Sequence, residues 1–138
     1  MIPIFVLDAC ALLAILANED GADAVVKLYN QAQSGDIVLK MHKINLLEVY
    51  YGIYRKYGES NSTKFIEEIN HSPISIVHDI SDEVFVESGR LKATYKLSLA
   101  DSIALAESIT SNATLITADH HEFDMVEQQE NIKILWIR

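Results

Sequence analysis

The chain has 138 residues, 49% of them apolar and 22% charged, which excludes a disordered protein and fits one globular domain over residues 1–138. A formal net charge of −9 argues against a protein that binds nucleic acid by broad phosphate neutralisation. Cys10 is the only cysteine, so no internal disulfide can form and a reducing, cytoplasmic location is expected. No segment reaches the ~18 apolar residues of a membrane helix, so we expect no membrane association.

The N-terminal segment is typical of a strand that runs directly into a helix. Residues 2–7 are short, β-branched and aromatic without polar alternation, which indicates a strand covered on both faces. Residues 9–16 then favour a helix. Asp8 lies between them, where it either caps this helix or faces the ligand site at the carboxyl end of a strand. Further along, residues 22–33 predict an amphipathic helix and residues 37–39 a second strand.

The next predicted helix, about residues 42–57, is apolar nearly all round, so we expect it to be buried. Glu48 lies inside this helix, and a buried Glu is rare unless it is paired or binds a metal. The alternative is an exposed helix edge on which Glu48 pairs with Arg55 or Lys56. Gly52, one turn after Glu48, would let another group approach the carboxylate closely.

The stretch after this helix predicts one more helix and one more strand. Ser60 to Ser62 can cap a helix over residues 63–70, and Pro73 blocks its continuation. Residues 74–77 then have the pattern of a third strand.

A further helix is predicted from Ser81 to about Tyr95, and the densest positive charge of the chain lies near its end. The cations are Arg90, Lys92 and Lys96. The helix dipole favours cations at this position, which is one explanation. The other is that they supply the phosphate contacts that this acidic chain otherwise lacks.

Ser98 and Asp101 have the spacing of a capping box at the start of a predicted helix over residues 99–111. Asp101 therefore has a structural role available. It also shares its helix face with small and apolar residues, so we expect its carboxylate to point towards the interior or a cleft.

A fourth buried strand is predicted over residues 113–117, and Asp119 follows it closely. Asp119 and Glu122 again have capping-box spacing, so Asp119 can be a helix cap. The neighbouring His120 and His121 do not share a helix face, so we interpret them as surface residues. A short helix and a last strand over residues 132–136 complete the chain.

Strands that alternate with helices predict an α/β fold, a three-layer α/β/α sandwich with a mostly parallel central sheet of four to five strands. Asp8, Glu48, Asp101 and Asp119 can then converge at one edge of this sheet. Clustered carboxylates repel one another unless a hard cation neutralises them, and their oxygens suit Mg²⁺ or Mn²⁺. The chain has no Cys/His cluster for zinc and no Gly-rich phosphate loop. Since acid-bound metal ions serve phosphodiester hydrolysis, the residues favour a metal-dependent nuclease.

Four segments in this order carry a resemblance to a known family: residues 5–8, 45–52, 97–104 and 115–119. Together they resemble the PIN-domain nucleases, most closely the ribonuclease toxins of VapBC-type toxin–antitoxin pairs, over essentially the whole chain. The resemblance implies an endoribonuclease in which Asp8, Glu48, Asp101 and Asp119 hold Mg²⁺ or Mn²⁺, assisted by the Thr117 hydroxyl. It also implies a homodimer and a small antitoxin that blocks the site.

Two other functions remain open at this point: a catalytically silent PIN-like binding module, and a nuclease that acts on structured DNA. The four filled acidic positions argue against the first, and the lack of extra basic or helix-hairpin segments argues against the second. The sequence leaves open which RNA is cut and whether one or two metal ions bind. Because the stretch from Asp119 to Phe123 is one residue longer than a common family spacing, it also leaves open whether Asp124 contributes.

Overall fold

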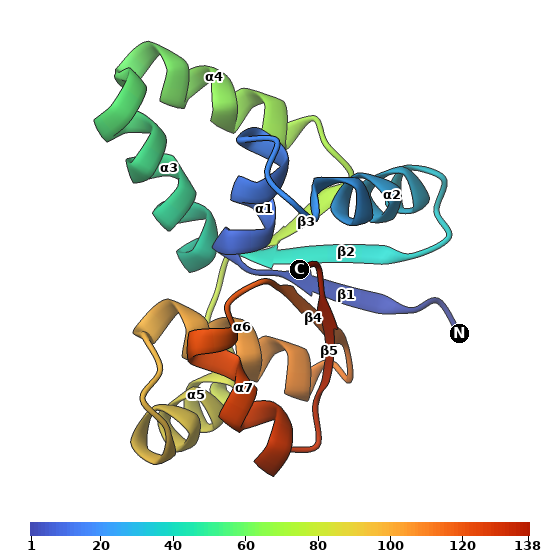
Figure 1. Ribbon diagram of the computed structural model, residues 1–138, viewed down its shortest axis with the longest axis vertical. Coiled ribbons are helices and arrows are strands. Elements are labelled where there is room, and N and C mark those ends of the chain that lie inside the picture. The colour runs from blue at the N-terminus through green and yellow to red at the C-terminus, as the bar shows by residue number, and fades with distance from the viewer.

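The computed structural model describes all of residues 1–138 and places a parallel five-stranded sheet between two layers of helices (Figure 1). The strands are β1 (Ile4–Leu7), β2 (Val38–His42), β3 (Ile74–Val77), β4 (Thr114–Thr117) and β5 (Lys133–Trp136). Their order in the sheet is β3-β2-β1-β4-β5, and every neighbouring pair is parallel. The predicted three-layer α/β fold is thus confirmed.

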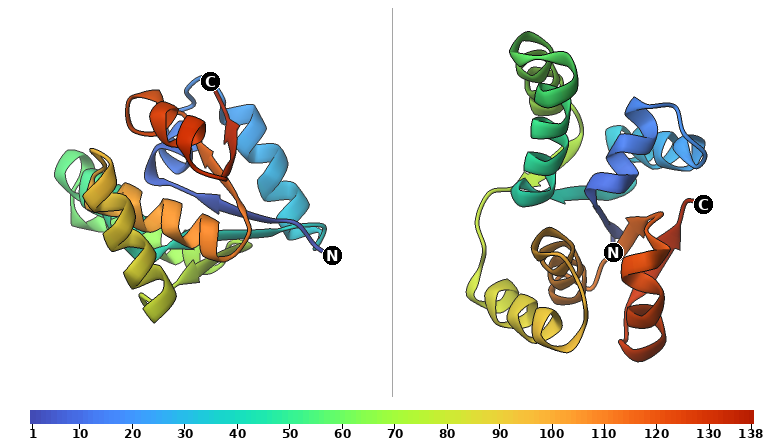
Figure 2. Two further views of the ribbon diagram at one scale, coloured as in Figure 1. Left: turned by 90° about the horizontal axis from the view of Figure 1, so that it is seen from below. Right: turned by 60° about the vertical axis from the view of Figure 1, so that its left-hand side comes forward.

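The helices divide between the two faces of the sheet according to their place in the chain. They are α1 (Ala9–Leu16), α2 (Ala22–Gln33), α3 (Lys43–Tyr57), α4 (Glu59–Asn70), α5 (Asp82–Thr94), α6 (Leu99–Thr110) and α7 (His120–Gln129). The first four cover one face and the last three cover the other (Figures 1 and 2). None of them has the length and apolar character that crossing a bilayer would require.

Alternating residues of the central strands pack into two separate hydrophobic cores, one on each face of the sheet. Val6 and Leu115 pack with α5, α6 and α7, whereas Leu7 and Ile116 pack with α1 to α4, and all four are fully buried. This two-sided burial follows from the period of two along a strand and explains why β1 shows no polar alternation. The expectation of a strand covered on both faces is therefore correct.

The helix α4 begins earlier than its sequence pattern predicts. Its first residue is Glu59, and the predicted cap residue Ser62 instead lies inside the helix, where its hydroxyl donates to the Glu59 carbonyl. Gly58 makes the early start possible, because its φ of 91° lies in the left-handed region that glycine adopts without strain. One glycine thus ends α3 and begins α4, so the predicted start at residue 63 is wrong.

The helix α3 is not buried all round, contrary to its composition. Leu47, Tyr51 and Tyr54 lie on an exposed face, while Leu46 and Val49 point into the core. The sequence pattern could not separate these two faces because both consist of large apolar or aromatic side chains.

The parallel sheet brings the carboxyl ends of its strands to one edge. Asp8 is the first residue after β1, and Thr117 is the last residue of the neighbouring β4. The register pairs Leu7 with Ile116, so the next positions along the two strands, Asp8 and Thr117, lie side by side.

Candidate active site

The Asp8 carboxylate is buried and is held through both of its oxygens. Oδ1 accepts a hydrogen bond of 2.8 Å from the Ala11 backbone N–H, which makes Asp8 the N-cap of α1. Oδ2 accepts from the Thr117 hydroxyl across the sheet. The cap therefore uses Oδ1 alone, and Oδ2 faces Thr117 at the carboxyl edge of the sheet.

Burial raises the pKa of Asp8 from its usual 3.8 to about 6, because the charged form loses its hydration. The hydrogen bonds from Thr117 and Ala11 oppose this rise by stabilising the carboxylate. The negative charges of Asp119 and Glu48 raise the pKa further, so both side chains lie near enough to interact with Asp8.

Thr117 also takes part in the hydrogen bonding at the start of α7, where Asp119 is the N-cap. The Asp119 carboxylate accepts from the Glu122 backbone N–H at 3.2 Å, as an N-cap should. In a complete capping box the Glu122 side chain would accept from the Asp119 N–H in return. That N–H donates instead to Thr117 Oγ1, at 3.0 Å. The Glu122 carboxylate is consequently not used by the cap.

Three carboxylates converge at this edge: Asp101, Asp119 and Glu122 each place one oxygen within 4.8 Å of the others. Burial raises the pKa of Asp101 to about 7, opposed by a hydrogen bond with Ser98 and reinforced by the charges of Asp8, Glu122 and Asp119. Glu122 was not among the predicted site residues. Its signal was visible as the fourth residue of the D-x-x-E motif, but the capping box already accounted for it.

Glu48 approaches from α3, in the other helical layer, and lies outside the group of three. Its side chain is half-buried, and this burial raises its pKa. It forms no ion pair with Arg55 or Lys56, so the pairing considered in the sequence does not occur. Its negative charge makes the smallest of the contributions that raise the pKa of Asp8.

The donor set suits a hard divalent cation. Every candidate ligand is a carboxylate oxygen, which Mg²⁺ and Mn²⁺ prefer. The pKa values of Asp8, Glu48 and Asp101 are raised, so the ionised form of each carboxylate is disfavoured in the metal-free protein. A divalent cation would remove that cost, because its charge favours the ionised form of each group.

The predicted phosphate-binding cations differ in their surroundings. The Arg90 guanidinium is bound by Glu87 and by Glu130, the latter at 2.7 Å, so its charge is compensated. The Lys92 ammonium donates to the Leu97 carbonyl at 2.7 Å. Lys96 is exposed and makes no such contact.

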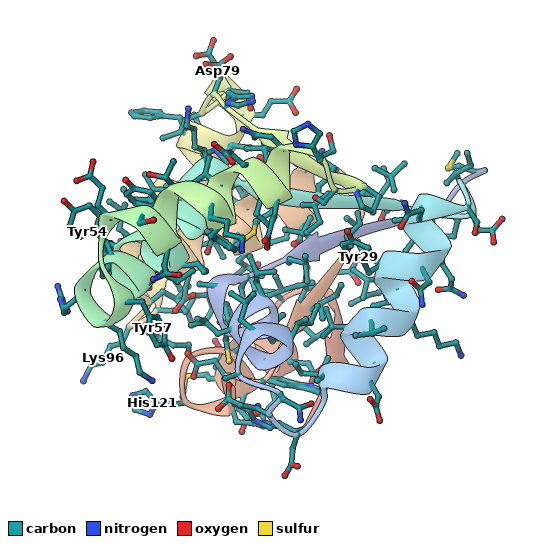
Figure 3. The ribbon with its side chains drawn as sticks, turned by 90° about the horizontal axis from the view of Figure 1, so that it is seen from above. Tyr29, Tyr54, Tyr57, Asp79, Lys96 and His121 are labelled. Atoms are coloured by element: carbon teal, nitrogen blue, oxygen red, sulfur yellow. The ribbon has the colours of Figure 1, made fainter.

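Asp124 and the two histidines stand apart from the carboxylates. Asp124 bonds to His120 Nδ1 at 2.7 Å, and His120 stacks on Trp136 with ring centroids 3.9 Å apart. His121 is exposed and lies at the surface in Figure 3. Asp124 therefore has a structural partner outside the group of three acids.

Comparison with known proteins extends this description. The sequence model of the PIN domain matches residues 5–128. No curated protein matches the chain. Among solved structures, the fold is similar to DNA-bound VapBC from Salmonella typhimurium, with a TM-score of 0.76, 16% identity and 100% coverage of both chains. VapBC-1 from nontypeable Haemophilus influenzae gives a TM-score of 0.74 at 18% identity, covering 97% of this chain and 98% of that chain.

A third similar structure is that of Mycobacterium tuberculosis VapC20, described as a sarcin-ricin loop cleaving toxin. Its TM-score is 0.67 at 12% identity, covering 91% of this chain and 95% of that chain. At these identities the structural likeness establishes the fold, whereas the sequence match over residues 5–128 establishes the relationship. The chain belongs to the PIN-domain family.

Proposed function

We propose that this protein is a Mg²⁺- or Mn²⁺-dependent endoribonuclease and the toxin of a toxin–antitoxin pair. The observation that carries the proposal is the convergence of Asp101, Asp119 and Glu122 beside the Asp8–Thr117 hydrogen bond. The similar structures support it, because several are VapBC complexes and one is described as cleaving the sarcin-ricin loop.

In this proposal each side chain has a defined task. Asp8, Asp101, Asp119 and Glu122 hold the cation, and Glu48 completes the acidic lining from α3. A bound divalent cation activates water and stabilises the leaving oxygen in phosphodiester hydrolysis. Thr117 orients the Asp8 carboxylate through its hydroxyl and lowers the pKa of that group, which favours the ionised form that a metal needs.

Glu48 has a second task in the proposed reaction. Because burial raises its pKa, its carboxylate is a stronger base than an ordinary Glu and is better suited to accept a proton from water.

Of the three cations near the end of α5, we retain Lys96 as a phosphate contact, since its ammonium is exposed and makes no bond within the chain.

The test is cleavage of labelled RNA by the purified protein with Mg²⁺, with Mn²⁺ and with EDTA. We expect cleavage with either metal and none with EDTA. Asp101→Asn should abolish cleavage while keeping the fold, since its backbone N–H still donates to Ser98 Oγ. Asp124→Asn is the matched control and should cleave as the wild type does.

Each rival function predicts a different result in this assay. A wild-type protein that binds RNA but never cuts it with either metal would support the silent binding module. Selective cleavage of branched DNA would support the structured-DNA nuclease. Wild-type activity in a folded Asp101→Asn protein would remove Asp101 from the reaction.

The proposed partners need separate evidence. We infer a homodimer and a small antitoxin, in line with the VapBC complexes that share this fold. A short reading frame directly upstream or overlapping, encoding a DNA-binding protein, is the expected source of the antitoxin. Co-expression of the two should give a stable complex in which RNA cleavage is suppressed, and light scattering of the isolated protein should give twice the chain mass.

A further inference from the structure

The C-terminal half of α3 combines exposed aromatic rings with positive charge that no carboxylate balances. Between Glu48 and Glu59 the chain has two cations, four tyrosines and no acid, although the whole protein has a net charge of −9. Neither cation, Arg55 or Lys56, forms an ion pair. Three of the tyrosines are 44%, 46% and 60% exposed: Tyr51, Tyr54 and Tyr57 respectively.

Each cation lies over a tyrosine ring. The Arg55 guanidinium carbon is 5.4 Å from the centre of the Tyr51 ring, and the Lys56 ammonium is 5.3 Å from that of Tyr57. The dipole of α3 accounts for cations near its C-terminus. It does not account for the large aromatic rings exposed to solvent beside them. A group of exposed apolar side chains is typical of a surface that binds a ligand or a partner.

This surface continues directly from the carboxylate site. Glu48, Tyr51 and Arg55 are spaced i, i+3 and i+7, so they share one face of α3. With a rise of about 1.5 Å per residue, Tyr51 lies about 4.5 Å and Arg55 about 10 Å beyond Glu48 along the helix axis. A Cβ on Gly52 would have nothing within 4 Å, so the helix surface one turn after Glu48 is open.

The same side of the molecule holds Lys96 from the opposite helical layer. Figure 3 shows Tyr54, Tyr57, Lys96 and His121 towards one edge of the structure, with Tyr29 of α2 well away from them. Two exposed tyrosines of α3 and the exposed Lys96 therefore lie towards the same side of the molecule in this view.

We propose that the Tyr51–Arg55 pair binds single-stranded RNA beside the carboxylate site, an unpaired base stacking on the pair while Arg55 contacts a phosphate. The inference rests on the proposed function for its substrate. In duplex RNA the bases are already stacked on one another, so only an unpaired strand can offer a base to a tyrosine. A platform of this kind admits any base, which leaves sequence choice to contacts elsewhere.

Two observations favour RNA as the ligand of this surface. The Arg90 cation is neutralised by Glu87 and Glu130, whereas Arg55 retains its full charge for a phosphate. A second copy of the chain is a poorer match, because an isologous interface would set this stretch, with its two cations and no acid, against the same stretch of the partner.

The experiment measures binding without cleavage, by fluorescence anisotropy of a short fluorescein-labelled single-stranded RNA of mixed sequence in EDTA. Tyr51→Leu should weaken binding roughly five- to a hundredfold, and Tyr51→Phe, which keeps the ring, should restore it. Arg55→Gln should weaken binding and lower the slope of log Kd against log salt by about 0.7. Lys27→Gln, on α2, removes the same charge far from the site and should change neither quantity.

A duplex of the same sequence completes the test. The wild type should bind the single strand more tightly than the duplex, and Tyr51→Leu should lose that preference. Equal binding by wild type and Tyr51→Leu, or a larger loss in Arg90→Gln than in Arg55→Gln, would overturn the proposal. A change in the solution mass of Tyr51→Leu by light scattering would instead assign the surface to an interface between copies, and would also overturn it.

The outcomes separate this inference from the proposed function. RNA cleavage by the wild type together with unaffected binding by both α3 variants would refute the RNA platform and leave the nuclease standing. Single-stranded RNA binding that depends on Tyr51, in a protein that never cleaves RNA with Mg²⁺ or Mn²⁺, would do the opposite.

Discussion

Replacing Asp8 with Asn should stabilise the metal-free protein at neutral pH. Burial raises the pKa of Asp8 from 3.8 to about 6, so the folded state binds this proton more tightly than the unfolded state does. The folded state is then penalised as the pH rises, beginning near 4 and complete above about 6. A pKa difference of this size corresponds to about 3 kcal/mol. Asn carries no charge at any pH, so the variant escapes this penalty.

The substitution also has a cost. Asp8 accepts hydrogen bonds from both Ala11 N–H and the Thr117 hydroxyl, and an Asn side chain has a single carbonyl oxygen for the two donors. Losing one hydrogen bond costs about 1 kcal/mol. The expected balance for Asp8→Asn is a gain of about 1–2 kcal/mol in unfolding free energy above pH 6, and a loss of about 1 kcal/mol below pH 4.

Metal should reverse the order of the two proteins. At about a hundred times its dissociation constant, Mn²⁺ adds about 2.7 kcal/mol to the wild type, equivalent to a rise of roughly 10 °C in Tm for a chain of this size. Asp8→Asn should lose most of that rise. Asp124→Asn is the matched control, since its carboxylate bonds to His120 outside the cluster, and it should respond to Mn²⁺ as the wild type does.

Urea titrations from about pH 3 to about pH 8 in EDTA, with thermal melts in Mn²⁺ at neutral pH, provide the measurement. An Asp8→Asn protein less stable than the wild type at pH 7 would mean that the cap and the Thr117 bond outweigh the burial of the charge. A full Mn²⁺ response in the variant would remove Asp8 from the metal site.

Three further substitutions have distinct expected results. Glu122→Gln should weaken Mn²⁺ affinity by calorimetry yet leave α7 intact, because the cap uses only the Glu122 backbone N–H; unchanged affinity would take Glu122 out of the metal set. Lys40→Met should lower the unfolding free energy, measured in urea, by about 3–5 kcal/mol, because it leaves the buried Glu107 carboxylate without the Lys40 ammonium that lies 3.3 Å from it. Adding Glu107→Leu should recover most of this loss. Asn45→Leu should add about 1–3 kcal/mol, because neither amide atom of this buried side chain has a partner; destabilisation would reveal a partner such as bound water.

The fold was predictable where local pattern and tertiary environment agree. Residues 22–33 and 74–77 have the predicted bounds as α2 and β3, because their apolar spacing and flanking turn residues leave one interpretation. The start of α4 was not predictable from the serines, because the left-handed Gly58 rather than a side-chain cap begins it. The exposure of Tyr51 and Tyr54 was hidden because apolar periodicity alone cannot distinguish a core face from a binding face.

The site shows the same division between local and tertiary information. Asp8, Asp101 and Asp119 could be placed at one sheet edge from their positions after strands and at a helix start. Glu122 could not be added, because releasing its carboxylate from the cap depends on the Asp119 N–H bonding to Thr117. Whether Glu48 reaches that edge depends on how α3 packs, which no local motif encodes.

The hydrogen bond between Asp8 and Thr117 joins positions 109 residues apart, so the first and last parts of the site are synthesised at very different times. At roughly 5–20 residues per second, a ribosome takes roughly 5–20 s to travel from one to the other. Throughout that interval β1 has no β4 to pair with, and the nascent chain carries isolated carboxylates instead of an assembled centre. Translation that stops before residue 117 releases fragments that cannot form it. The proposed activity would in this way stay absent from the nascent chain until β4 has been synthesised and has paired with β1.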